Sequence, residues 1–108
     1  MIRIGISITG PVPPASLPQV LERSVRLGFD EIWVSETFFG GGPLTTAALA
    51  LAQTDLPVGF GVLSTAVRHP AALAMEIATL ACLYPGLIRL GLGLGAVPSL
   101  RRMGLDEV

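Results

Sequence analysis

The sequence is poor in charge. Asp, Glu, Lys and Arg make up 14% of its 108 residues, against about 25% in an average soluble domain. Seven basic and eight acidic residues leave a net charge of -1, so charge gives no reason to expect binding to nucleic acid or to an acidic membrane. With so few charges, the strands of such a chain must be covered on much of both faces.

Cysteine and histidine each occur once, as Cys82 and His69. One cysteine excludes an internal disulfide and a cysteine metal cluster, and its place in an apolar helical run predicts a buried, unreactive thiol. His69 precedes Pro70, so we expect it to serve the start of a helix rather than catalysis. Long apolar runs are also missing, because Glu76, Arg89 and Gly/Pro clusters interrupt each stretch before the ~18 residues that a bilayer requires. No segment resembles a secretory signal, and we expect a cytoplasmic location.

Four segments alternate with period two, which predicts β-strands. They are residues 2–9, 31–35, 58–62 and 88–94. In the third segment Val58, Phe60 and Val62 are expected on one face, with Gly59 and Gly61 on the other. The first and last segments repeat this division between aliphatic and small residues. The predicted sheet therefore has one apolar face and one nearly empty face.

Helices are expected between these strands. Ser16 and Gln19 fit a capping box at the start of the first helix, and Gly28 supplies a left-handed stop. The other expected helices cover residues 43–53, 68–84 and 98–103. Strands and helices that alternate with such short connections predict a parallel sheet with right-handed crossovers.

Two α/β architectures fit this alternation. A doubly wound sheet needs bulky residues on both faces of its strands, whereas a barrel keeps its helices outside and reserves the other face for its interior. The recurring small face favours the barrel. A complete TIM (βα)8 barrel has eight strands and ~250 residues. We therefore interpret residues 1–108 as a single partial domain, the N-terminal half of such a barrel with about four βα units, truncated at the start of the fourth helix.

In either architecture a ligand binds at the C-terminal ends of the strands. This rule selects Ser7 and Thr9, Glu36 with Thr37, residues 61–64 with Arg68 and His69, and residues 93–96. Glu36 fits a solvated loop carboxylate as well as a ligand contact, and Arg68 fits a surface ion pair as well as a phosphate contact. The glycines of the last segment also match a G-x-G-x-x-A phosphate fingerprint, which leaves a dinucleotide-binding module as an alternative.

Four segments carry a resemblance to a known family. They are GFDEIWVSE (residues 28–36), GVLSTAVRHP (residues 61–70), LYPG and LGLGLG. In this order and spacing the chain resembles the bacterial luciferase-like superfamily of flavin- or deazaflavin-dependent oxidoreductases over nearly its whole length. Residues 103–105 resemble the MGL that begins the next helix in that family.

The resemblance implies a barrel whose strand ends hold FMN or the deazaflavin coenzyme F420 and a small-molecule substrate. It implies a non-prolyl cis peptide at Gly61 and Val62 that supports the ring, with Glu36 near the polar edge of the ring. The expected cofactor-binding residues are Glu36, Gly61, Val62, Leu63, Gly93, Leu94 and Gly95. The chemistry implied is hydride transfer through the flavin, with or without incorporation of oxygen.

Two positions leave the catalytic residues unassigned. In the family, deazaflavin-dependent sugar-phosphate dehydrogenases place a histidine where Thr37 stands and a glutamate where Ala96 stands. Because four βα units form half of a pocket, we expect this chain alone to be inactive. The alternative is a non-catalytic half-barrel that forms a homo-oligomer or complements a partner carrying the other half.

Overall fold

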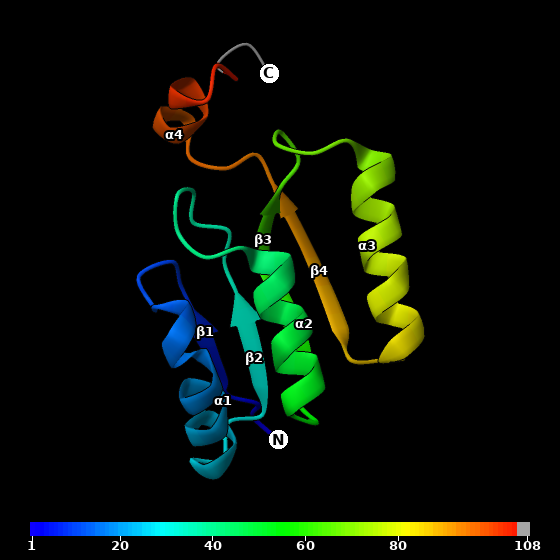
Figure 1. The fold of residues 1–108 in the computed structure, drawn as a ribbon. Coiled ribbons are helices and arrows are strands. Elements are labelled where there is room, and N and C mark those ends of the chain that lie inside the picture. Colours follow the sequence, from blue (N-terminus) through cyan, green and yellow to red (C-terminus); the bar gives the residue numbers. More distant parts are fainter. Residues whose placement is uncertain (106–108) are drawn as a thin grey trace.

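The computed structural model describes residues 1–105, which alternate between strands and helices (Figure 1). The elements are β1 (Gly5–Ile8), the short 3₁₀ turn η1 (Pro14–Ser16), α1 (Leu17–Arg26), β2 (Glu31–Val34), α2 (Pro43–Gln53), β3 (Val58–Ser64), α3 (Pro70–Leu83), β4 (Ile88–Gly93) and α4 (Val97–Arg102). The predicted end of the domain at Val108 lies outside the described residues.

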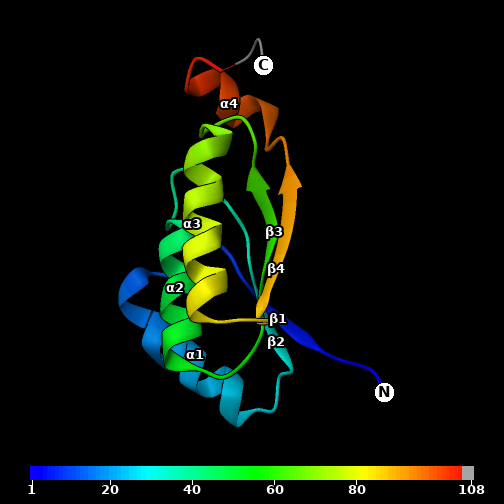
Figure 2. The same ribbon diagram turned by 90° about the vertical axis from the view of Figure 1, so that its right-hand side faces the viewer.

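The four strands form one parallel sheet in the order β1-β2-β3-β4. The register pairs Gly5 with Glu31, Ile32 with Val58, and Val58 with Ile88. Figure 2 shows α1, α2 and α3 together on one face of this sheet, and among residues 1–105 no helix covers the opposite face. The parallel pairing and the alternating helices confirm the predicted parallel α/β fold.

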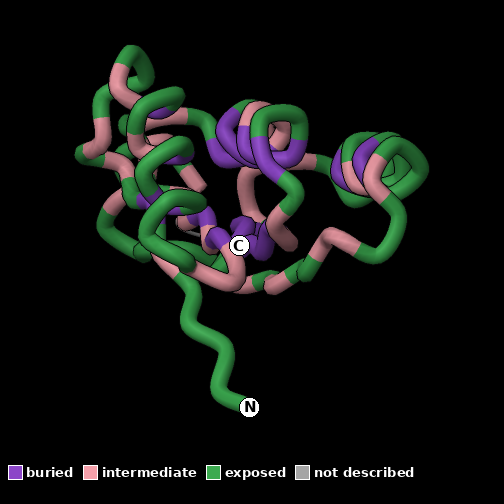
Figure 3. The backbone as a smooth tube through the Cα atoms, turned by 90° about the horizontal axis from the view of Figure 1, so that it is seen from below, coloured by how far each residue is buried: buried purple, intermediate pink, exposed green. Residues whose placement is uncertain are grey.

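The hydrophobic core lies between the sheet and the three long helices, where the buried segments of the chain face inward (Figure 3). Strands β2 and β3 contribute most of it, and α3 buries only Leu73 and Leu80. The fully covered core side chains include Leu21, Ile32, Ala47, Ala50, Val58, Phe60 and Leu63. The core is therefore thick beneath β2 and β3 and thin beneath β4.

Local helix signals work as predicted at two places. Gly28 ends α1 with a φ of 84°, a left-handed conformation that other residues adopt only at a cost. His69 is the N-cap of α3, and its Nδ1 atom accepts a hydrogen bond from the backbone N–H of Ala71 at 3.0 Å. This bond satisfies one of the free N–H groups of the first turn, so the structural role expected for His69 is confirmed.

The first strand is shorter than its alternation predicts. Strand β1 begins at Gly5, and Ile2 and Ile4 are exposed. The reason is the partner strand, because β2 begins at Glu31 opposite Gly5 and offers the preceding residues no regular pairing. Aliphatic alternation reports which face a residue would occupy but not how long its neighbouring strand is.

Two helix-end predictions are wrong. Ser16 lies in η1 with helical angles, and its side chain makes no capping hydrogen bond, because the turn begins earlier at Pro14. The segment 103–105 ends α4 instead of beginning a helix. Gly104 has a φ of 75°, and the N–H of Leu105 donates to the carbonyl of Leu100 at 2.9 Å, which closes the helix in a left-handed turn.

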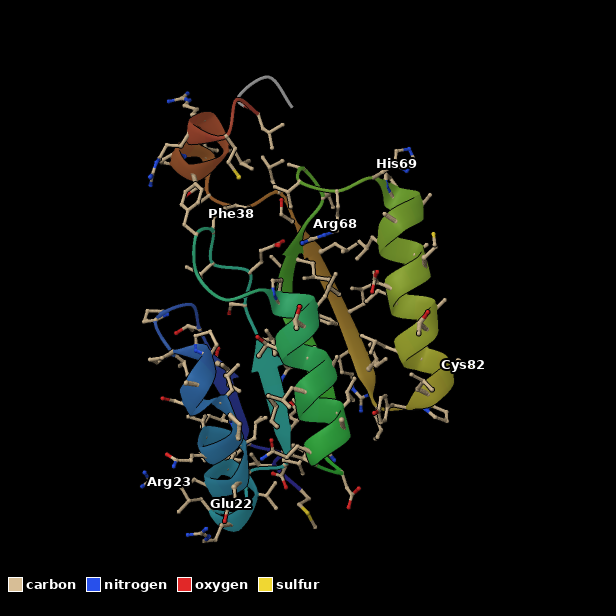
Figure 4. The ribbon with its side chains drawn as sticks, in the orientation of Figure 1. Glu22, Arg23, Phe38, Arg68, His69 and Cys82 are labelled. Atoms are coloured by element: carbon tan, nitrogen blue, oxygen red, sulfur yellow. The ribbon has the colours of Figure 1, made fainter. Side chains whose placement is uncertain are left out.

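The prediction of a buried thiol is also wrong. Cys82 is exposed on the outer side of α3, as Figure 4 shows. An apolar helical run suggests burial on all sides, but α3 is covered by the sheet on one side only. The apolar residues on its remaining surface, Cys82 included, face outward.

Candidate functional site

Strand β3 carries a bulge at its C-terminal end. Phe60 pairs with Leu90 and Leu63 pairs with Leu92, so three steps on β3 match two on β4. The peptide bond between Gly61 and Val62 is cis, as the family resemblance implies. The bulge therefore lies where the sequence placed the support for a ring.

The bulge exchanges the faces of two residues. Leu63 is 0% exposed in the core, whereas Val62 is 41% exposed and lies against the positions of Gly91 and Gly93. The prediction that Val62 shares a face with the core residue Phe60 is therefore wrong. One extra residue in a strand reverses the alternation beyond it.

The glycine face is not empty, because Trp33 lies across it. A Cβ atom on Gly59 would be 2.6 Å from Cε3 of Trp33, and one on Gly5 would be 2.9 Å from its Cδ1. The indole Nε1–H donates to the Glu31 carboxylate at 3.0 Å. The small residues of β1 and β3 thus leave room for one large side chain of β2. This side chain fills the face toward the N-terminal ends of the strands.

Val62 and Phe38 lie at the C-terminal ends of the strands, beside Gly93 and Gly95. A Cβ atom on Gly93 would lie 2.7 Å from Cγ2 of Val62, and one on Gly95 would lie 2.8 Å from Cε2 of Phe38. Phe38 comes from the loop after β2 and lies below α4 in Figure 4. These glycines accommodate side chains of the same chain, and their predicted contact with a ring stays a prediction, as does that of Leu94.

Glu36 and Arg68 form a nearly buried ion pair beside the bulge. Their side chains are 8% and 19% exposed, and both guanidinium ends donate to the carboxylate, with Nη1 at 2.9 Å from Oε1. The same Oε1 accepts the backbone N–H of Ser64 at 2.7 Å. Figure 4 shows Arg68 at the C-terminal end of β3. Glu36 is therefore a paired carboxylate, not a solvated one.

The pairing stabilises the charged form of Arg68. Its hydrogen bond to Glu36 raises the pKa of the Arg68 guanidinium, partial burial lowers it, and the charge of Glu36 raises it further, with a net upward shift. The pairing therefore favours the cationic form of a side chain that is not deprotonated in proteins in any case. Of the two interpretations of Arg68 from the sequence, the ion pair is the one present.

Two further residues near the bulge were missed by the sequence analysis. Ser35 Oγ donates to the Gly61 carbonyl at 3.2 Å, and Phe38 covers Gly95. The strand-end rule would have found Ser35, because it follows directly on the last residue of β2. Phe38 had no such signal, since its contact depends on how the loop after β2 turns toward β4.

Metal and membrane features are lacking from the described part of the chain. No group of three or more His, Cys, Asp or Glu side chains within residues 1–105 is arranged to hold a metal ion. No helix there is both long enough and apolar enough to cross a membrane. The site is thus a surface of apolar side chains, backbone and one ion pair.

Comparison with known sequences identifies relatives of this chain. The family described as luciferase-like monooxygenase matches residues 1–107. An F420-dependent glucose-6-phosphate dehydrogenase of Kribbella flavida is 33% identical over 105 residues, covering 87% of this chain and 31% of the relative. The 4-hydroxyprotoasukamycin monooxygenase of Streptomyces nodosus subsp. asukaensis is 32% identical over 88 residues, covering 75% and 24%. The chain spans about a third or less of the length of these relatives.

Solved structures show the same fold. The coenzyme F420 dependent tetrahydromethanopterin reductase of Methanopyrus kandleri superposes with a TM-score of 0.82 at 24% identity, over 95% of this chain and 30% of that one. The oxygenating constituent of 3,6-diketocamphane monooxygenase from Pseudomonas putida, in complex with FMN, gives 0.80 at 21% identity over 95% and 32%. The sheet and its helices are thus half of a TIM barrel, as predicted. The chain belongs to the luciferase-like monooxygenase family.

Proposed function

We propose that this chain forms the strand-end part of the cofactor site of an oxidoreductase that binds FMN or F420 and transfers hydride to or from a small molecule, with or without incorporation of oxygen. The observation that carries the proposal is the β3 bulge, which presents Val62 on the uncovered face at the C-terminal end of the sheet. The names of the relatives support it, since several are F420-dependent and one structure is a complex with FMN.

The residues at the bulge fit a flat, largely apolar ring. Val62 offers an exposed apolar side chain that rests on Gly93, so it can support a ring without moving away from it. The residues that would hold the ring are Gly61, Val62, Gly93, Leu94 and Gly95, with Glu36 near its polar edge. Leu63 is fully buried and would support the bulge from the core. When bound, the flavin or deazaflavin supplies the hydride chemistry. The chain would position it and keep water from one of its faces.

We assign no catalytic acid or base. Thr37 Oγ1 accepts a hydrogen bond from the backbone N–H of Gly10 at 3.4 Å, and Ala96 has no titratable group. The sugar phosphate named for the dehydrogenase relatives therefore has no support from these two positions. A cytoplasmic location belongs to the same proposal, because a chain with one cysteine has no internal disulfide that would indicate an oxidising compartment.

Titration with FMN and with F420 tests this function. We expect the full chain to bind one of the two in a 1:1 complex, seen as quenching of cofactor fluorescence. Val62→Asp should weaken binding about tenfold or more, because the ring would desolvate a carboxylate. The control is Val25→Asp on α1, since Val25 is 46% exposed against 41% for Val62. Binding of neither cofactor, or equal weakening by both variants, would contradict the proposal.

Self-association is a second candidate function, favoured by the surface between α3 and β4. A groove of about 540 Å³ runs there, lined by apolar side chains that include Leu73, Ile77, Leu90 and Leu92. Leu90 and Leu92 are half exposed, and within the described residues β4 pairs only with β3. A second copy of the chain could cover this face and lie along β4.

Gel filtration coupled to light scattering decides this candidate. We expect the wild-type chain to elute as a dimer and Leu92→Glu to shift it to a monomer, because a carboxylate in the buried groove would lose its hydration. Met75→Glu, on the outward side of α3, should leave the dimer intact. A monomeric wild-type chain at high protein concentration would exclude the candidate.

A further inference from the structure

We propose that Glu36 and Arg68 are positioning residues that clamp the β3 bulge in the shape that presents Val62. The proposal rests on the proposed function only in what the clamp is for, since the clamp itself is a property of this chain. We name the Glu36–Arg68 pair together with Ser35 the bulge clamp.

The clamp begins where regular pairing between β2 and β3 stops. The last regular pair is Val34 with Phe60. Beyond it, Ser35 Oγ donates to the Gly61 carbonyl at 3.2 Å, and the backbone N–H of Glu36 donates to the Val62 carbonyl at 3.2 Å. Both residues joined by the cis peptide are thus held by consecutive residues of the segment after β2.

The carboxylate of Glu36 holds the far side of the bulge. Its Oε1 accepts the Ser64 N–H at 2.7 Å, a bond to a charged acceptor and therefore a strong one. The backbone N–H of Glu36 also donates to the Val62 carbonyl. Glu36 is therefore hydrogen-bonded to the residues on both sides of Leu63. The backbone conformation between Val62 and Ser64 therefore depends on the conformation of the Glu36 side chain.

Arg68 fixes that side chain. The fork of the guanidinium binds both carboxylate oxygens, and Nη1 also donates to the Ser64 carbonyl at 3.3 Å. Ser64 is thereby held through its N–H by Glu36 and through its carbonyl by Arg68. A lysine would supply the charge but not the fork, so geometry as well as charge is needed.

A merely structural ion pair would behave differently. It would stabilise the whole fold and raise the protection of every core amide by the same factor. A clamp also holds the bulge locally. Its loss therefore speeds amide exchange at Ser64 while exchange in the core stays slow. Trp33 is a second reporter, because its ring lies 3.3 Å from the Cβ position of Gly61 and it is the only tryptophan.

Amide hydrogen exchange on the full chain tests the clamp. In Arg68→Met we expect exchange at Ser64 to rise about tenfold or more relative to exchange at the core residue Ile32, with easier acrylamide quenching of Trp33. Arg68→Lys and Glu36→Gln should give smaller increases in the same direction, and they keep the test valid if Arg68→Met does not fold. The control is Arg26→Met, which breaks the exposed pair with Glu22 on α1 and should leave Ser64 unchanged.

Two results would overturn the clamp. One is exchange at Ser64 and Ile32 that rises by the same factor in the Arg68 variants. The other is cofactor binding as tight in these variants as in the wild type, measured by the FMN and F420 titrations, despite a freed Ser64. If the wild type binds neither cofactor, the proposed function fails, and the exchange ratio still decides whether the clamp exists.

Discussion

Gly91→Ala is expected to lower the free energy of unfolding by about 3 kcal/mol, at the upper end of the range for overpacked interiors. A Cβ atom at this position would lie 2.4 Å from the carbonyl oxygen of Phe60, which belongs to the backbone of the neighbouring strand. Phe60 pairs with Leu90 immediately before the bulge. The carbonyl therefore cannot retreat without opening the β3–β4 pairing.

The matched control is Gly41→Ala in the loop after β2, where no atom lies within 4 Å of the Cβ position. We expect its free energy of unfolding to stay within about 0.5 kcal/mol of the wild type. Urea denaturation followed by circular dichroism measures both variants. Equal stability of the two variants would show that β3 and β4 are farther apart than described.

Leu63→Ala is expected to cost about 2 to 5 kcal/mol, because Leu63 is fully buried and its removal leaves a cavity in the core. Val62→Ala should cost less than about 1 kcal/mol, because Val62 is partly exposed on the other face. The same denaturation experiment compares them. Regular alternation from Val58 predicts the opposite order, so the comparison isolates the effect of the bulge.

Cofactor binding by the Val62→Ala variant complements the comparison of stabilities. Val62→Ala should weaken FMN or F420 binding while leaving stability nearly unchanged. A Val62 variant that is less stable than the Leu63 variant would mean that β3 continues without a bulge. In that case Val62 would lie in the core and could not support a ring.

The fold follows from signals that are local in the sequence. Period-two alternation located the strands, and residues such as Gly28 and His69 act at helix ends as their chemistry predicts. The parallel sheet followed because helices between strands force a crossover. The errors at Ile2 and at Ser16 are errors of element ends, which depend on a partner strand or on a preceding turn.

The site was predictable in place but not in detail. The strand-end rule brought Glu36 and Arg68 to the same edge of the sheet, yet residues 32 positions apart can meet there in many ways, and no pattern predicts a bidentate pair. The small face was expected to be nearly empty because alternation describes where a side chain starts, not how far it reaches. Trp33 and Val62 extend over neighbouring strands and fill it.

The order of the strands also bears on how the chain folds as it is synthesised. Each strand pairs with the one before it in the sequence, from β1 to β4, so no strand must wait for a later segment to be inserted beside it. The sheet can grow from the N-terminus one βα unit at a time while the chain leaves the ribosome. Each pairing still joins distant residues, such as Gly5 with Glu31 and Val58 with Ile88, and non-local pairing of this kind in a parallel sheet forms slowly.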